Sequence, residues 1–196
     1  MTTQQIKASI EPSRTTGERL VLIAGTSGTG KDTLMYRVAR MLKPSGVRVR
    51  VTRRWITRPS HHSENFFPVT REEFEAAAKE GKFVLWWFIY GLYYGVPREI
   101  EDWLCNGEIV LVNLSRSVLH EARERYSGCK IVKVEVPPAE AERRIRSRGR
   151  ERGFALEARI RRMNEPVSVL DPDLIIQNVN LGESIRKLAA FLQQLA

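Results

Sequence analysis

The sequence is poor in cysteine and has no long apolar run. Each absence excludes a class of protein. Only two cysteines occur among 196 residues, Cys105 and Cys129, and their spacing fits neither a disulfide framework nor a zinc site. We therefore expect two reduced thiols with structural roles. No uncharged apolar stretch is long enough to cross a bilayer, and residues 1–7 lack the apolar block of a signal peptide. The sequence thus predicts a soluble, cytoplasmic protein.

Acidic residues are also in the minority. The chain has 32 Lys and Arg against 23 Asp and Glu, which gives a net charge of +9 and an isoelectric point near 9.9. Such an excess favours an anionic partner, and nucleic acid, a membrane surface and phosphorylated metabolites all qualify. The net charge alone does not show which of these partners the protein binds. With 42% hydrophobic residues, the chain can bury one sizeable core beside at most a small inserted subdomain.

One glycine-rich stretch organises the rest of the chain. It follows the apolar residues 20–24, precedes a helical pattern in residues 34–42, and consists of Gly25, Thr26, Ser27, Gly28, Thr29, Gly30, Lys31, Asp32 and Thr33. The order of strand, glycine loop and helix directs backbone N–H groups and a helix N-terminus at a phosphate, which Lys31 can also reach. The stretch therefore predicts a binding site for a nucleoside triphosphate.

The residue after Lys31 departs from the usual pattern of such loops. Ser or Thr commonly stands there as a magnesium ligand, whereas this chain has Asp32, with the hydroxyl of Thr33 one place later. Magnesium prefers oxygen ligands, and a carboxylate is among the commonest. We therefore expect Asp32 and Thr33 to hold or orient Mg²⁺.

Strand and helix patterns alternate along the rest of the chain. Expected strands cover residues 47–51, 83–90, 92–97, 109–113, 130–136 and 173–178, and expected helices cover 70–80, 99–106, 117–126, 139–148, 156–163 and 181–196. The alternation predicts an α/β, three-layer fold built on a parallel sheet. Residues 1–17 show no apolar periodicity, so we expect a disordered N-terminal extension before a folded domain at residues 18–196.

Three features permit both a structural and a functional interpretation. Trp86 and Trp87 would suit base stacking, but an aromatic-rich strand is usually core, and we predict core here. Arginines crowd residues 143–162; a solvated helix face is one interpretation, and we favour a lid that closes over phosphates. His61 and His62 adjoin a basic loop, and we expect surface histidines without a ligand role.

The order of motifs resembles the guanylate-kinase-like branch of the nucleoside monophosphate kinases, across residues 20–195. The match rests on the glycine loop, on Thr57-Arg58-Pro59, on Tyr93-Tyr94-Gly95 and on Arg148-Gly149-Arg150. The resemblance implies a P-loop kinase in which Arg58 binds the acceptor phosphate and Tyr93 and Tyr94 line the acceptor pocket. It also implies an acceptor-binding subdomain near residues 53–98 and a lid near residues 143–162.

The guanine-reading residues of that branch are missing. Leu85 stands before Trp86 where guanylate kinases commonly place a glutamate, and Leu92 replaces the asparagine of their Gly-Asn-Tyr-Tyr-Gly motif. A buried guanine would then lose partners for its polar edge, at a cost of about 1–3 kcal/mol for each unpaired group. A guanine acceptor is therefore disfavoured.

A narrower resemblance is to the ribose 1,5-bisphosphate phosphokinases of phosphonate utilisation, which make 5-phosphoribosyl 1-diphosphate. The shared motifs are Gly30-Lys31-Asp32, Trp55-Ile56-Thr57-Arg58, Ser63-Glu64-Asn65, Gly91-Leu92-Tyr93-Tyr94-Gly95-Val96, Val110-Leu111-Val112-Asn113, Ser115-Arg116 and Arg148-Gly149-Arg150-Glu151. This resemblance implies phosphoryl transfer from ATP, with Mg²⁺, to a phosphorylated sugar.

Each candidate residue has an expected role in that reaction. The acceptor oxygen is already anionic, so we expect positioning and charge neutralisation without a general base. The expected catalytic residues are Lys31, Arg148 and Arg150. Asn113 ends an apolar strand at the sheet edge where such folds bind ligands. The expected substrate-binding residues are Arg54, Arg58, Glu64, Asn65, Tyr93, Tyr94, Asn113 and Arg116.

Two rival classes stay open. A kinase of another acceptor, such as a nucleoside monophosphate or gluconate, would share the loop and differ in its substrate. A guanylate-kinase-like binding module that has lost catalysis would usually have an eroded loop, whereas this chain keeps Gly30 and Lys31. We expect no nucleic-acid or membrane partner, and a homodimer is left open.

Overall fold

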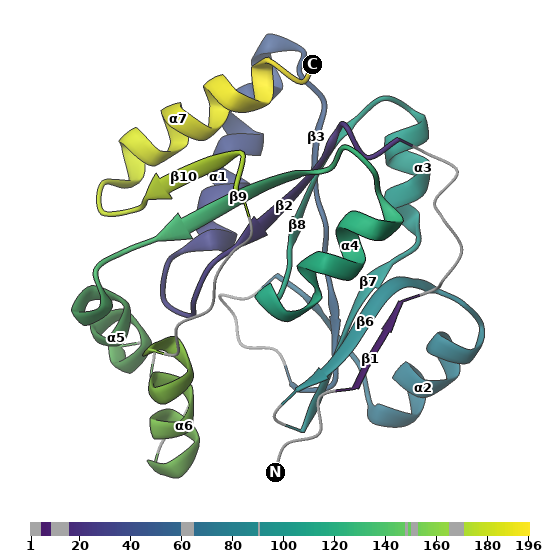
Figure 1. Ribbon diagram of the computed structural model, residues 1–196, viewed down its shortest axis with the longest axis vertical. Helices are drawn as coiled ribbons and strands as arrows, with labels where there is room; N and C mark the ends of the chain where they lie inside the picture. The colour runs from purple at the N-terminus through teal and green to yellow at the C-terminus, as the bar shows by residue number, and fades with distance from the viewer. Residues whose placement is uncertain are drawn as a thin grey trace.

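The computed structural model describes residues 5–8, 16–59, 65–89, 91–147, 149, 153–164 and 171–196. Two five-stranded sheets lie against each other, and helices cover them (Figure 1). None of the helices in these ranges is long and apolar enough to cross a membrane.

The first sheet is parallel and carries the expected alternation of strands and helices. Its order is β10 (Leu174–Gln177), β9 (Lys130–Glu135), β2 (Leu20–Ala24), β8 (Ile109–Asn113) and β3 (Val49–Val51). Strands β2 and β8 are buried along their whole length, because a parallel sheet is covered on both faces. Helices α1 (Lys31–Leu42) and α7 (Leu181–Gln193) pack on one of these faces. The predicted α/β fold is confirmed.

The second sheet is mostly antiparallel and lies on the other face of the parallel sheet. Its order is β1 (Gln5–Ala8), β6 (Phe83–Ile89), β7 (Leu92–Pro97), β4 (Trp55–Ile56) and β5 (Phe67–Pro68). An apolar core joins the two sheets and includes α3 (Glu99–Cys105) and α4 (Leu119–Arg125). Helix α2 (Arg71–Lys79) covers the outer face of the second sheet (Figure 1). Short 3-10 turns at Lys43–Ser45 and Arg116–Val118 follow α1 and precede α4.

Several local predictions in this second sheet are confirmed. Strands β6 and β7, both expected from the sequence, pair antiparallel as a hairpin. At the start of α2, the Glu73 N–H donates to Thr70 Oγ1 at 3.1 Å, and the Thr70 N–H donates to Glu73 Oε2 at 2.7 Å, which completes a capping box. Trp87 is 1% exposed in the core between the sheets, and Trp86 packs on the α2 side. Trp87 is therefore a core residue, and Trp86 is partly buried against the cluster under α2.

Strand β1 corrects the prediction for the N-terminal residues. Residues 5–8 pair antiparallel with residues 85–88 of β6. The expected disorder over residues 1–17 is therefore wrong for this strand, and for Gly17, whose N–H donates to the Ser127 carbonyl oxygen at 2.8 Å. Pairing at a sheet edge uses backbone groups, so the lack of apolar periodicity gave no sign of it.

Removing residues 1–8 should lower the melting temperature by about 3–6 °C, because the outer edge of β6 loses its backbone partners. Removing only residues 1–4 spares β1, and for this control we expect no change. Thermal unfolding followed by circular dichroism measures both. Equal melting temperatures for the full chain and the longer deletion would show that β1 adds no stability.

Candidate functional site

The glycine loop between β2 and α1 is seated tightly against two neighbouring elements. Gly25, Gly28 and Gly30 have φ angles of 150°, 84° and 82°, a region that favours glycine. A Cβ at Gly28 would lie 2.5 Å from the carbonyl oxygen of Ala141 in α5 (Pro138–Ser147). A Cβ at Gly25 would overlap the carbonyl oxygen of Val134 in β9. The conformation of the loop therefore depends on its glycines.

Lys31 lies against the loop that it follows. Its Nζ donates hydrogen bonds to the carbonyl oxygens of Gly25 and Thr26 at 2.8 and 2.7 Å. Thr29 Oγ1 donates to the same Thr26 oxygen at 3.0 Å. The ammonium thus adds its charge to that of the helix N-terminus, where an anion is favoured. The loop and Lys31 therefore concentrate positive charge at the start of α1.

Asp32 and Asn113, which were predicted separately, are hydrogen-bonded to each other. Asn113 ends β8 and is 7% exposed, and its Nδ2 donates to Asp32 Oδ1 at 2.6 Å. The bond orients the Asp32 carboxylate beside the exposed Thr33. Groups of three or more His, Cys, Asp or Glu that could hold a metal are absent from the described ranges. One oriented carboxylate fits Mg²⁺, which proteins usually hold through one or two carboxylates together with substrate phosphates.

Asn178, which lies near the C-terminal end of the sequence, holds the glycine loop in place through a hydrogen bond. We did not predict this contact from the sequence. Asn178 follows β10, is 4% exposed, and donates from Nδ2 to the Thr29 carbonyl oxygen at 2.7 Å. The Asn178 carbonyl oxygen accepts from Arg144 Nη2 of α5 at 3.2 Å. Arg144 is itself held by Glu140, with Nε 2.6 Å from Oε1. Asn178 therefore connects the loop to α5.

Asn178→Ala should lower kcat/KM for ATP about tenfold and the melting temperature by about 3–8 °C, because the buried Thr29 carbonyl oxygen loses its donor. Asn180→Ala is the matched control. Asn180 Oδ1 accepts from the Glu183 N–H at 3.2 Å and caps α7, so its loss should reduce stability and leave ATP kinetics unchanged. Steady-state kinetics at saturating acceptor separates the two variants. If Asn178→Ala and Asn180→Ala have the same kinetics with ATP, the hydrogen bond of Asn178 does not hold the loop for ATP binding.

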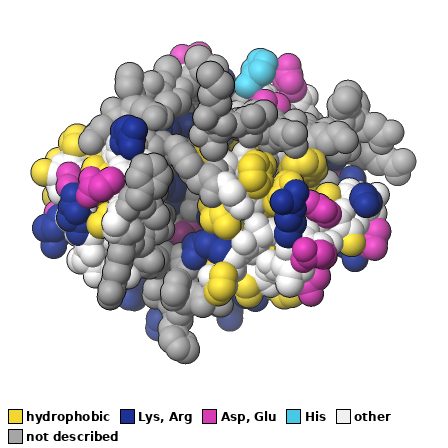
Figure 2. Space-filling view, turned by 90° about the horizontal axis from the view of Figure 1, so that it is seen from below, with side chains coloured by type: hydrophobic (Ala, Val, Ile, Leu, Met, Phe, Trp, Pro, Cys, Tyr) yellow, Lys and Arg dark blue, Asp and Glu magenta, His cyan; other side chains and the backbone are white. Residues whose placement is uncertain are grey.

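Helices α5 and α6 (Gly153–Asn164) form an arm that projects beside the loop (Figure 1). The two helices join through a small apolar cluster that includes Ala141, Ile145 and Met163. Seen from below, the molecule is hollowed between this arm and the second sheet, and dark blue Lys and Arg side chains lie around the hollow (Figure 2). The arm contains the segment predicted to be a lid.

Three arginines of α5, Arg143, Arg144 and Arg146, pair with acidic side chains of the same helix. Arg143 and Arg144 donate to Glu140, and these hydrogen bonds lower the pKa of Glu140 to about 2. Arg146 pairs with Glu142 at 2.8 Å. Such pairs are typical of a solvated helix face, the alternative interpretation of the arginine-rich segment. The predicted residues that lie outside the described ranges are Arg148, Arg150, Glu64, His61 and His62.

The predicted acceptor residues divide between the two faces of the second sheet. Tyr94 faces the parallel sheet, where it stacks on Trp87 with ring centroids 5.3 Å apart, and the Arg54 guanidinium lies 5.8 Å from its ring centroid. Tyr93 faces α2 and stacks on Phe74 at 5.1 Å. Neighbouring residues of a strand point to opposite faces. A single cavity would therefore meet only one of the two tyrosine rings.

A pocket of about 460 Å³ opens on the Tyr93 side of the second sheet. Arg58, at its wall, lies 4.5 Å from the centroid of the Phe66 ring. Arg71, which the sequence analysis did not nominate, lies 5.6 Å from the Tyr93 ring centroid. The lining residues are Thr57, Arg58, Pro59, Pro68, Val69, Thr70, Arg71, Glu73, Gly91 and Tyr93. Two predicted acceptor residues, Arg58 and Tyr93, thus meet in one concave site.

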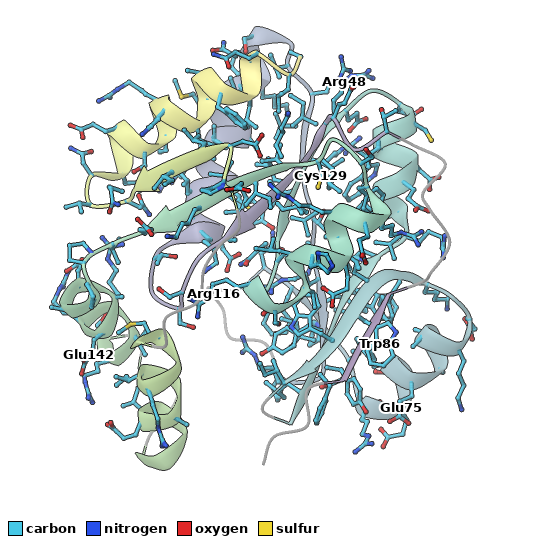
Figure 3. All side chains as sticks on the ribbon, viewed as in Figure 1. Arg48, Glu75, Trp86, Arg116, Cys129 and Glu142 are labelled. Carbon is cyan, nitrogen blue, oxygen red and sulfur yellow. The ribbon has the colours of Figure 1, made fainter. Side chains whose placement is uncertain are left out.

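Two further candidates lie on connecting segments. Arg116 begins the 3-10 turn that follows β8, at the carboxyl edge of the parallel sheet and on the side where the α5–α6 arm projects (Figure 3). Asn65 is partly exposed and leads into β5. The edge of the parallel sheet thus gathers the glycine loop, Asn113 and Arg116, as a ligand site in this class of fold does.

Comparison with known proteins adds to this geometry. A family model described as guanylate kinase matches residues 17–195. A protein of Azotobacter vinelandii, named ribose 1,5-bisphosphate phosphokinase PhnN, is 36% identical over 182 residues, which cover 92% of this chain and 98% of the relative. A protein of the same name from Thiobacillus denitrificans is 41% identical over 149 residues, covering 75% and 77%. The chain belongs to the ribose 1,5-bisphosphate phosphokinase family. The resemblance inferred from the motifs is confirmed.

A solved structure supports the fold of this phosphokinase family member. The crystal structure of guanylate kinase from Anaplasma phagocytophilum aligns with a TM-score of 0.58 at 21% identity, covering 97% of this chain and 88% of that one. The similarity concerns the fold alone. The roles assigned to individual residues of this phosphokinase stay predictions.

Proposed function

We propose that the protein transfers the γ-phosphoryl group of ATP to the 1-phosphate of ribose 1,5-bisphosphate and forms 5-phosphoribosyl 1-diphosphate, in the service of phosphonate degradation. The Asp32–Asn113 hydrogen bond at 2.6 Å carries the proposal. It joins the unusual loop carboxylate to the polar end of β8, and both residues belong to motifs shared with the family. The named relatives support the same assignment.

In this reaction an oxygen of the 1-phosphate bonds to the γ-phosphorus, and the bond to the bridging oxygen of ADP breaks. The acceptor oxygen is anionic, so no residue needs to remove a proton. Lys31 and the loop N–H groups bind the β- and γ-phosphates. Asp32 and Thr33 would hold Mg²⁺, which neutralises phosphate charge when bound. Arg148 and Arg150 are proposed to close on the migrating group from a lid at residues 143–162.

The acceptor is proposed to bind in the subdomain at residues 53–98, next to the edge of the parallel sheet. Arginine suits this role because its planar guanidinium pairs with two phosphate oxygens at once. The proposed acceptor residues are Arg54, Arg58, Glu64, Asn65, Tyr93, Tyr94, Asn113 and Arg116. Tyr93 and Tyr94 face opposite sides of β7. We therefore propose that Tyr94 and Arg54 contact the sugar, and that Tyr93 packs behind them on the α2 side of the second sheet.

We further propose a cytoplasmic enzyme. Cys105 and Cys129 are both free thiols, and burial raises the pKa of Cys129 to about 11, which keeps that thiol unreactive. The proposed partners are ATP and a phosphorylated sugar, with no nucleic acid or membrane, and a homodimer remains a prediction.

A matched pair of acceptors tests the proposed function. Release of ADP is measured with ATP, Mg²⁺ and either ribose 1,5-bisphosphate or ribose 5-phosphate, which lacks the accepting 1-phosphate. The proposal expects rapid release with the bisphosphate and only background release with the monophosphate. Equal release with both, or none with the bisphosphate, contradicts it.

Asp32→Ala should raise the Mg²⁺ concentration needed for half-maximal activity about tenfold, while KM for ATP measured at saturating Mg²⁺ changes little. The carboxylate acts on the metal, and the loop N–H groups still bind the phosphates. Asp102→Ala, an exposed carboxylate on α3, is the control. A Mg²⁺ titration curve that is the same for Asp32→Ala and wild type would assign Asp32 another role.

A further inference from the structure

The Tyr36 hydroxyl on α1 is not used by any role assigned above. Tyr36 is one helical turn beyond Asp32, so the two side chains share a face of the helix. Its phenolic oxygen is buried and finds no hydrogen-bond partner within the part of the chain that the structure describes. Buried polar groups are paired in the great majority of cases. A buried hydroxyl without a protein partner beside a substrate site indicates a partner on the substrate.

The charges around this hydroxyl define the chemistry of that partner. After burial, the charges that shift the pKa of Tyr36 are the Asp32 carboxylate, which raises it, and the guanidiniums of Arg53 and Arg54, which lower it. A guanidinium only donates hydrogen bonds, so neither arginine can accept the phenolic proton. Asp32 already accepts from Asn113 through Oδ1. Burial, followed by the Asp32 charge, raises the pKa of Tyr36 to about 12, so the phenol remains a donor at neutral pH.

Arg53 and Arg54 favour an anion at the same place. Both follow the carboxyl end of β3, and Arg54 also lies over the Tyr94 ring of the second sheet. Arg53 already donates from Nη2 to the Phe66 carbonyl oxygen at 3.2 Å, and its other N–H groups could still reach a ligand. A negatively charged group rich in acceptor oxygens would accept from the hydroxyl and from both guanidiniums. We propose that Tyr36 donates a hydrogen bond from Oη to a phosphate oxygen of the bound acceptor, and that it is a specificity-determining residue of the acceptor site. This inference rests on the proposed function.

Tyr36→Phe removes only this hydroxyl and tests the proposal. KM for ribose 1,5-bisphosphate should rise about tenfold, equivalent to about 1.4 kcal/mol, with KM for ATP within about twofold of wild type. The melting temperature should not fall, because no hydrogen bond to the described protein is lost. Tyr126→Phe is the matched control: Tyr126 is buried and its Oη donates to Glu101 Oε1 at 3.0 Å. That variant should melt at a lower temperature and keep the wild-type KM for the bisphosphate.

Two other outcomes overturn the proposal in different ways. If wild type phosphorylates the bisphosphate and Tyr36→Phe has the same KM for it, Tyr36 does not bind the acceptor and the proposed function stands. If wild type does not phosphorylate the bisphosphate, the proposed function and this inference both fail.

Discussion

Replacing Lys31 with alanine should abolish phosphoryl transfer and leave the fold intact. The ammonium lies against the loop carbonyls of Gly25 and Thr26, so it is placed to meet phosphates bound there. Losing a charge that stabilises the migrating phosphoryl group costs on the order of 3 kcal/mol or more, or at least about a hundredfold in kcat. The buried residues of α1 are Leu34, Met35, Val38 and Leu42, which the substitution does not change.

Lys43→Ala is the matched control, because Lys43 is an exposed lysine just past the other end of α1. Both variants are compared with wild type by initial rates and by thermal unfolding. We expect both variants to stay folded, with a small loss of melting temperature for Lys31→Ala because the part-buried carbonyl oxygens of Gly25 and Thr26 lose a donor, and activity only for Lys43→Ala. If Lys31→Ala keeps activity within a few-fold of wild type, the loop does not perform the proposed chemistry.

GMP should be a poor acceptor, with kcat/KM up to about 10⁴-fold below that of ribose 1,5-bisphosphate. Leu85 is 3% exposed in the core between the sheets, and Leu92 lies at the start of β7. Neither side chain can pair with the polar edge of guanine, so binding GMP would leave base donors and acceptors unpaired. A compact bisphosphorylated sugar has no such edge, and it brings additional charge to Arg54, Arg58 and Arg116.

This selectivity is measured as ADP release with GMP, AMP and ribose 1,5-bisphosphate, side by side at equal concentration. AMP serves as the control for a nucleotide whose base lacks the guanine edge. The expected order is the bisphosphate far above both nucleotides. Comparable efficiency with GMP would make the protein a divergent guanylate kinase.

The part of the site proposed to bind ATP could be predicted from the sequence because its residues are contiguous in the chain. Strand β2, the glycine loop and the first turn of α1 are contiguous, and the chemistry of phosphate binding fixes both the residue types and their order. Asn113 could be placed as well, because the polar residue that ends a buried parallel strand lies at the ligand edge of the sheet. Its bond to Asp32 followed once the register of β2 and β8 brought Ile23 opposite Asn113.

Other parts of the site depend on tertiary register that no local pattern encodes. Asn178 and Thr29 are 149 positions apart and meet only because β10 pairs with β9, where the Asn178 N–H donates to the Glu135 carbonyl oxygen at 2.7 Å. Strand β1 was missed because its pairing with β6 uses backbone groups. Tyr36 carries no motif, and its relation to Arg53 and Arg54 depends on how α1 packs beside the end of β3.

³¹P NMR of the product, after incubation of the full-length protein with ATP, Mg²⁺ and ribose 1,5-bisphosphate, shows directly which phosphate of the sugar accepts the γ-phosphoryl group. We expect the 1-phosphate monoester resonance to disappear, two mutually coupled diphosphate resonances distinct from those of ADP to replace it, and the 5-phosphate resonance to persist. Conversion of the 5-phosphate instead, or release of the γ-phosphate as inorganic phosphate with the sugar unchanged, would contradict the account.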